Sequence, residues 1–283
     1  MQNKIINILT VDVEDYYMVS AFERNVKFED WDKYESRVVQ NTQKVLSILE
    51  EFNVKATFFV LGWVAEKFPH LVKNICSKGH EIASHGYKHR LVYNQNPEEF
   101  RQDVRRAKTI LERIIGAPIC GYRAPSYSIT NSSLWALNIL VEEGLKYDSS
   151  IFPIYHDRGG FPEAKRFFHK IKVNGTEILE FPLSTIRVMG YNVAVGGGGY
   201  FRLLPFWLTK KALNWINKQN QQAVVYIHPW ELDFGQPRIK TCSLSKFRHY
   251  VNLNSTEEKL KKLLNEFIFS SFLNVFNKDF IKC

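Results

Sequence analysis

Short apolar runs alternate with longer amphipathic segments along this 283-residue chain, and this alternation restricts the folds that it can adopt. The runs have the length of buried strands and end at polar or turn-forming residues. They predict strands at Ile6–Val11, Ala56–Val60, Glu81–Ser84, Gly121–Arg123, Lys146–Asp148, Ile178–Phe181 and Val224–His228. Strands that are separated by helices form parallel β–α units, so we expect an α/β fold. Closure of the sheet into a barrel fits the pattern, but periodicity alone does not establish it.

Helical patterns lie between most of these strands, at Thr42–Phe52, Pro97–Ile115, Asn131–Glu143 and Pro205–Asn217. In the third of them, Asn131 or Ser132 would cap the N-terminus and Gly144 would end the helix. The tail, Glu257–Phe272, has the pattern of an amphipathic helix that packs on the body of the protein.

Two segments lack a regular period. Tyr155–Lys172 is typical of a loop, and Met189–Tyr200 contains the four glycines Gly196–Gly199. Such a run is either a flexible lid or a place where the backbone approaches a ligand closely.

Length and composition exclude several classes of protein. No run of 18 apolar residues occurs, so we expect no membrane span. The N-terminus has no signal-peptide pattern. The four cysteines, Cys76, Cys120, Cys242 and Cys283, are widely scattered and predict free thiols in a reducing compartment, hence a cytoplasmic location.

The formal charge of +9 is moderately basic, but the basic residues are spread along the chain and no nucleic-acid motif accompanies them. We therefore expect no nucleic-acid partner. The densest basic cluster, within residues 238–262, is interpreted as a solvated face. Attraction to an acidic glycan, or peripheral contact with an anionic membrane, is the alternative.

Ionisable residues stand at the ends of five predicted strands. They are Asp12 and Glu14, His85 and His89, Arg123, Asp148, and His228. In parallel barrels the active site forms at the carboxyl ends of the strands. This coincidence is the strongest indication of a catalytic centre in the residues themselves.

His85 and His89 are four residues apart, a spacing at which two imidazoles hold one divalent metal from the same side of a helical turn. A carboxylate as third ligand would leave a position open for water. Asp12 and Glu14 point to one face of an extended segment, so one could bind the metal while the other accepts a proton. Asp15 points the other way and is suited to capping the following loop.

Arg123, if buried at its strand end, needs a carboxylate partner, and Asp12 is the natural one. His228 follows an apolar strand and could act as a general acid, with Asp148 holding its tautomer. Four other histidines are interpreted as ordinary core or surface residues: His80, His156, His169 and His249.

Five motifs resemble, in order, those of the polysaccharide deacetylases of the NodB-homology group, carbohydrate esterase family four. They are Thr10–Glu14, where the family usually has Thr-Phe-Asp-Asp-Gly, Ser84–His89 with its metal-binding histidine pair, Arg123–Pro125, whose arginine positions the catalytic base, Asp148–Ser150, and Ile227–His228. The resemblance implies a distorted parallel (β/α)7-type barrel over residues 1–237. Residues 238–283 would then form a C-terminal helical extension packed on it.

The second aspartate of the family's first motif falls on Val13 in this chain. The resemblance then implies that Glu14, His85 and His89 are the metal ligands, with Asp15 as the alternative to Glu14. The ion would be zinc, or else cobalt, manganese or nickel.

Within the family, residues 197–205 and 228–233 resemble a bacterial branch associated with exopolysaccharide and exosortase gene clusters. The resemblance implies hydrolysis of N-acetyl groups on N-acetylhexosamine units of a bacterial surface polysaccharide or its precursor. Tyr127, Tyr200, Trp207 and Trp230 are candidate platforms for sugar rings. Two other functions stay open: a cyclic-imide or ureide hydrolase of the same fold, similar to allantoinase, and a catalytically silent carbohydrate-binding protein.

Overall fold

A buried parallel strand lies at the centre of the fold. The computed structural model describes residues 5–280 of the chain. Strand β1 (Ile6–Val13) lies between β10 and β2, and all of its residues except Ile6 are buried. A strand covered on both faces has a near-continuous apolar sequence, which is why this one stands out in the sequence.

Seven parallel strands make up most of the sheet, in the spatial order β10, β1, β2, β3, β4, β5, β7. Antiparallel β6 extends it beyond β7, and β11 pairs with the start of β1. Their bounds are β2 Thr57–Val60, β3 Glu81–Ser84, β4 Gly121–Tyr122, β5 Tyr147–Asp148, β6 His169–Val173, β7 Thr176–Glu180, β10 Val224–Ile227 and β11 Ile268–Ser270. A separate hairpin joins β8 (Thr185–Val188) to β9 (Tyr191–Ala194).

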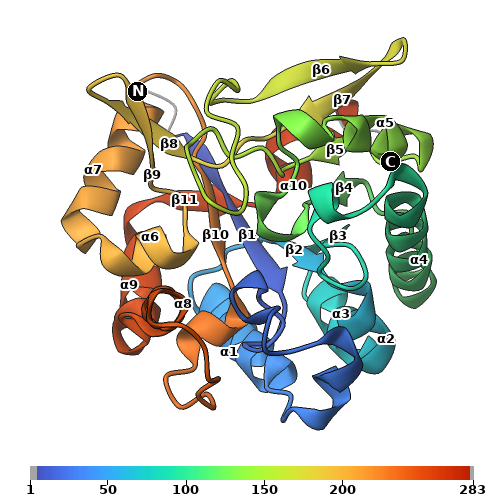
Figure 1. Cartoon of the computed structure of the whole chain (residues 1–283). Coiled ribbons are helices and arrows are strands. Elements are labelled where there is room, and N and C mark those ends of the chain that lie inside the picture. The colour runs from blue at the N-terminus through green and yellow to red at the C-terminus, as the bar shows by residue number, and fades with distance from the viewer. Residues whose placement is uncertain (1–4, 281–283) are drawn as a thin grey trace.

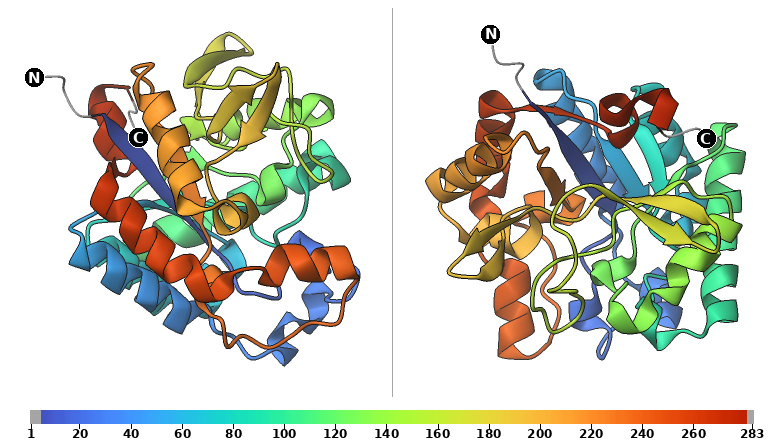
Figure 2. Two further views of the ribbon diagram at one scale, coloured as in Figure 1. Left: turned by 90° about the vertical axis from the view of Figure 1, so that its left-hand side faces the viewer. Right: turned by 90° about the horizontal axis from the view of Figure 1, so that it is seen from above.

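Helices surround the sheet (Figure 1), with α1 to α4 along its lower and right-hand sides and α7 and α9 on the left. The side view shows α7 next to α9, which contact each other (Figure 2). The bounds are α1 Val38–Glu51, α2 Gly62–Lys67, α3 Pro69–Ser77, α4 Pro97–Ile115, α5 Trp135–Glu142, α6 Gly198–Leu203, α7 Phe206–Asn217, α8 Ser243–Tyr250, α9 Leu253–Glu266 and α10 Phe272–Phe280.

The four-glycine run lies against strand β10. Tyr226 N donates a hydrogen bond to Gly196 O at 2.7 Å, and Gly197 pairs with Tyr226 in parallel. A Cβ atom on Gly197 would lie 2.1 Å from the carbonyl oxygen of Tyr226, so only glycine fits there. The backbone therefore approaches a strand rather than a ligand at Gly196 and Gly197. Only Gly198 and Gly199 line a cavity.

All seven predicted strands form, within two residues of the expected bounds, and the α/β fold with a mostly parallel sheet is confirmed. The predicted tail helix Glu257–Phe272 is wrong at its end. Helix α9 stops at Glu266, and Ile268–Ser270 pairs instead with Ile6–Ile8. Pairing with β1 and burial of Phe269 override the helical pattern of this segment.

Two smaller expectations also fail. The predicted loop Tyr155–Lys172 contains most of β6 at its end. The segment after Thr130 begins with a short 3-10 turn, and Thr130 forms a capping box with Ser133, so neither Asn131 nor Ser132 is the cap. The division of the chain at residue 237 stays a prediction.

The expectation of four free thiols holds for Cys76 and Cys242 only. Cys120 is disulfide-bonded, and Cys283 lies outside the described residues. The cysteines therefore do not indicate a reducing compartment, and the cytoplasmic location stays a prediction. Within residues 5–280, none of the helices has the length and apolar character needed to cross a membrane.

Candidate metal centre and active site

Side chains from three strand ends meet in a cavity of about 400 Å³. Asp12 and Glu14 come from the end of β1, His85 and His89 from the segment after β3, and His228 from the residue after β10. Parallel neighbours bring these ends to one edge of the sheet. Other cavity-lining residues include Ser20, Ser126, Tyr127, Phe152, His156, Arg158, Tyr200, Arg202, Leu203, Trp230, Glu231, Leu244, Phe247, Arg248 and His249.

Glu14, His85 and His89 each present one ligand atom to a common point, and these atoms lie within 4.8 Å of one another. The Glu14 Oε2 and His89 Nε2 atoms are 2.8 Å apart. The His85 Nδ1 atom lies 2.8 Å from the carbonyl oxygen of Arg123, which fixes the ring and leaves Nε2 for a metal. Two imidazoles and a carboxylate suit a divalent transition metal such as zinc, so the residues fit the ion that the motifs imply.

The spacing of the two histidines suggested a helical turn, but the pair does not lie on one. Residues 85–91 form an irregular segment, and His89 has a φ of +54°. The bend in this segment, rather than helical periodicity, brings the two imidazoles together, with ring centroids 5.4 Å apart.

The charge states of His85 and Glu14 are those that a metal site requires. Burial lowers the pKa of His85 to about 4, so its imidazole is neutral at pH 7 and able to ligate. Burial alone would raise the pKa of Glu14, but the neighbouring imidazoles, His89 first, outweigh it and hold this pKa well below its usual range. Glu14 is therefore ionised.

Asp15, the alternative third ligand, faces away from the cavity. Its Oδ2 atom accepts hydrogen bonds from the Ser36 hydroxyl at 2.8 Å and from the N–H groups of Arg37 and Val38 at 2.8 and 3.1 Å. Asp15 thus holds the start of α1, the capping role that the sequence indicated. Val13 is fully buried in the core.

Asp12 has the arginine partner that the sequence predicted. The Arg123 Nη1 atom donates to Asp12 Oδ1 at 2.7 Å, and both side chains are buried. The remaining guanidinium N–H groups bond to Thr10 and to the carbonyl and hydroxyl of Ser149. The guanidinium is therefore fixed in place and holds the Asp12 carboxylate toward the cavity.

His228 lies across the cavity from Asp12, with its Nε2 atom 4.0 Å from Asp12 Oδ2 and 3.5 Å from Glu14 Oε1. Burial lowers its pKa, but the neighbouring carboxylates, Glu231 first, raise it to about 9. His228 is therefore protonated at pH 7, as a general acid must be.

The prediction that Asp148 holds the His228 imidazole is wrong. The Nδ1 atom of His228 lies 3.2 Å from Glu231 Oε1, and within the described part of the chain no hydrogen bond or ion pair joins His228 to Asp148. Residues Pro229–Leu232 form a 3-10 turn, and this turn places the side chain of Glu231, three residues after His228, beside the imidazole.

Asp148 instead supports the segment that carries Arg123. Its Oδ1 atom accepts from the Ser150 hydroxyl at 2.6 Å, and that hydroxyl accepts from the N–H of Ala124 at 2.7 Å. Burial and the adjacent Asp148 raise the pKa of Glu180 well above its ordinary value.

Three of the four candidate sugar platforms, Tyr127, Tyr200 and Trp230, line the cavity. Trp207 lies exposed on α7 and outside the lining of this cavity, so its role as a platform stays a prediction. His156 and His249, taken as ordinary residues, also line it. Sequence reasoning assigned no role to Glu231 or Arg202, although Glu231 is three residues after His228 and Arg202 follows the glycine run.

Comparison with known proteins agrees with this geometry. Residues 26–145 match the polysaccharide deacetylase family, and residues 149–277 match a domain of unknown function (DUF3473). A peptidoglycan-N-acetylglucosamine deacetylase of Bacillus cereus is 42% identical over 96 residues, 34% of this chain and 35% of that protein. A peptidoglycan deacetylase of Helicobacter pylori is 26% identical over 121 residues, 41% of this chain and 40% of that protein. The chain thus matches little more than a third of the length of these curated relatives.

Solved structures extend the likeness to the whole fold. A Mycobacterium smegmatis protein described as a polysaccharide deacetylase superposes with a TM-score of 0.61 and 21% identity, over 93% of this chain and 85% of that one. PuuE allantoinase superposes with a TM-score of 0.60 and 12% identity, over 95% and 87%. At these identities the structures show a shared (β/α)7-type fold alone. The family match over residues 26–145 and the motifs show that this chain carries a polysaccharide deacetylase domain of the NodB-homology group, carbohydrate esterase family four.

Proposed function

We propose that this chain is a metal-dependent hydrolase that removes N-acetyl groups from N-acetylhexosamine units of a bacterial surface polysaccharide or its precursor. One observation carries the proposal: a buried carboxylate, Asp12, and the imidazole of His228 face each other beside the Glu14, His85 and His89 triad. Amide hydrolysis needs these groups, because a base must activate water and an acid must protonate the departing amine.

Glu14, His85 and His89 would hold one divalent ion, which we propose is zinc, with cobalt, manganese or nickel as alternatives. When bound, such an ion polarises the amide carbonyl and makes water more acidic. The protein's own contribution is to keep the His85 imidazole neutral and Glu14 ionised, as the burial of His85 and the imidazoles beside Glu14 do.

Asp12 would accept the proton of the attacking water. Its Oδ1 atom is held by Arg123, so Oδ2 remains directed toward His228 and the cavity.

His228 would then give its Nε2 proton to the amine as the C–N bond breaks, releasing acetate and a free amino sugar. Tyr127, Tyr200 and Trp230 line the same cavity and would contact a pyranose ring there. The Bacillus cereus and Helicobacter pylori relatives are named as peptidoglycan deacetylases, which supports an N-acetylated glycan as the substrate. The exopolysaccharide branch rests on the resemblance of residues 197–205 and 228–233.

The test is hydrolysis by the full chain of N-acetylated glycan oligomers and, in parallel, of small cyclic imides, each with and without a chelator. We expect release of acetate from the glycans, abolished by the chelator and reduced at least about 10²-fold in Asp12→Asn. Chelator-insensitive cleavage of imides would favour an allantoinase-like hydrolase. Binding of glycans without turnover would indicate a silent carbohydrate-binding protein.

A further inference from the structure

Glu231 is a fully buried carboxylate that lies between two cations. Its Oε1 atom is 3.2 Å from His228 Nδ1 and 3.3 Å from Arg202 Nε. Its Oε2 atom has no hydrogen-bond partner among the described residues, so Oε1 carries both contacts. A carboxylate that is removed from water in this way persists only when it is paired.

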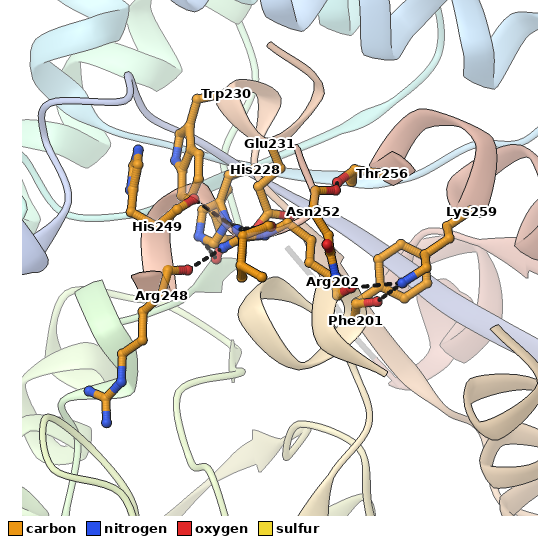
Figure 3. Close-up of polar contacts among 12 residues, drawn as sticks. Phe201, Arg202, His228, Trp230, Glu231, Arg248, His249, Asn252, Thr256 and Lys259 are labelled. Atoms are coloured by element: carbon orange, nitrogen blue, oxygen red, sulfur yellow. Dashed lines mark hydrogen bonds and ion pairs between the residues drawn. The ribbon is translucent and has the colours of Figure 1, made fainter. Parts of the chain in front are cut away.

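Arg202 is itself held firmly. Its Nη1 atom donates to the carbonyl oxygens of His249 at 2.8 Å and Val251 at 2.9 Å, and its Nη2 atom donates to the carbonyl of Arg248 at 2.9 Å. Figure 3 shows this side chain reaching from α6 to the end of α8. Carbonyl groups at a helix C-terminus attract a cation, so α8 fixes the guanidinium. Among the described residues its Nε atom makes no hydrogen bond, so the guanidinium holds Glu231 through the attraction of their charges.

The backbone of α6 is anchored separately. The Lys259 Nζ atom donates to the carbonyl oxygens of Phe201, Arg202 and Leu204, and Asn252 Nδ2 donates to Arg202 O (Figure 3). Lys259 therefore stabilises the same helix, and among the described residues no hydrogen bond or ion pair joins it to Glu231 or His228. A substitution of Lys259 is therefore a matched control for changes in activity that result only from lower stability of α6.

We infer that Glu231 and Arg202 are positioning residues for His228: Glu231 accepts the Nδ1–H of the imidazole and aims Nε2 at the cavity, and Arg202 holds Glu231 in place. This rests on the proposed role of His228 as the general acid. The general acid and its two positioning residues would then come from residues 198–251. The metal triad and the base come from the first 90 residues. In the same way, the aspartate of a catalytic triad accepts a hydrogen bond from its histidine and orients the ring.

The experiment compares Glu231→Gln, Arg202→Met, their double variant and Lys259→Met in the full, metal-loaded chain. Glu231→Gln keeps the shape and removes the charge. We expect it to lower kcat by about 10²-fold with little change in KM. Arg202→Met should lower kcat in the same direction, and the double variant should be no slower than Glu231→Gln, because Arg202 acts through Glu231. Lys259→Met should be less stable but keep the kcat of the parent protein.

The ¹⁵N chemical shifts of the His228 imidazole give a readout that does not need turnover. We expect a protonated, hydrogen-bonded Nδ1 in the parent and in Lys259→Met, and a changed Nδ1 signal in Glu231→Gln and Arg202→Met. If the parent shows no deacetylase activity, the proposed function fails while these shifts still decide the positioning role. Unchanged shifts in Glu231→Gln, a kcat equal to that of Lys259→Met, or additive losses in the double variant would overturn the inference.

Discussion

Two consecutive carboxylates, Glu14 and Asp15, have opposite surroundings. Glu14 faces two imidazoles across the cavity, whereas Asp15 accepts three hydrogen bonds at the start of α1. The alternation of side chains at a strand end separates them, and their order in the sequence was enough to favour Glu14 as the ligand.

We predict that Glu14→Ala lowers metal occupancy by more than about tenfold, since it removes one of the three ligands. Asp15→Ala should retain the metal but lower the free energy of unfolding by about 2 kcal/mol, because buried N–H groups at the start of α1 lose their acceptor. Elemental analysis and chemical denaturation measure the two effects. Loss of metal from Asp15→Ala, with full occupancy in Glu14→Ala, would refute the assignment of the third ligand.

The pH dependence of turnover should follow the titration of His228. Its pKa is raised to about 9, so the imidazolium needed as acid is present at neutral pH and is lost as the pH rises through this value. We predict that kcat falls on the alkaline side, with a midpoint at or below about 9, because a metal on Glu14 would offset part of that carboxylate's attraction. A pH–rate profile with saturating metal checks this. A kcat that keeps rising beyond pH 10 would exclude His228 as the acid.

The sequence predicted Asp12, Glu14, His85, His89, Arg123 and His228 as neighbours because each follows a strand of one parallel sheet. It did not predict the partner of His228. Asp148 also ends a strand, but it is used beneath Arg123, and the 3-10 turn after His228 supplies Glu231 instead. Strand ends specify which residues share an edge, whereas individual hydrogen bonds depend on loop geometry that periodicity does not encode.

At the scale of elements, the glycine run shows how an irregular segment can be structural. Gly197 lies against β10 with a φ of +155°, and Gly175 also has a positive φ, +82°, but open space around it. Loop-like composition identified the segment, but its contact with a strand 29 residues further along the chain was beyond local reasoning.

We predict that Gly197→Ala lowers the free energy of unfolding by about 3 kcal/mol, because the new Cβ would collide with the Tyr226 carbonyl. Gly175→Ala is the matched control and should cost only about 1 kcal/mol, since it adds backbone strain without a collision. Denaturation with urea compares the two. Equal losses would show that the close approach to β10 does not matter for stability.

The tail illustrates the same limit at the level of an element. Residues 257–266 are helical as their pattern indicates, but Ile268–Ser270 joins the sheet beside β1. Pairing between segments some 260 residues apart is a non-local interaction, and it outweighed a local helical preference.

At the scale of the whole molecule, the sequence predicted the parallel sheet because strands and helices alternate, but not the way its edges close. The base and metal triad come from β1 and the segment after β3, within the region before residue 90. The acid and its partners come from the region that matches the domain of unknown function. The proposed active site is therefore complete only when the end of β1, the region that matches the deacetylase family and the region that matches the domain of unknown function are folded together.

The most direct test of the account is acetate release from an N-acetylglucosamine oligomer by metal-stripped protein as zinc is added back. The account predicts that acetate and free amine appear together, in proportion to zinc, up to a single equivalent per chain, and that zinc-loaded Asp12→Asn stays almost inactive. Full acetate release by the stripped protein, or no release from any N-acetylated glycan at saturating zinc, would contradict it.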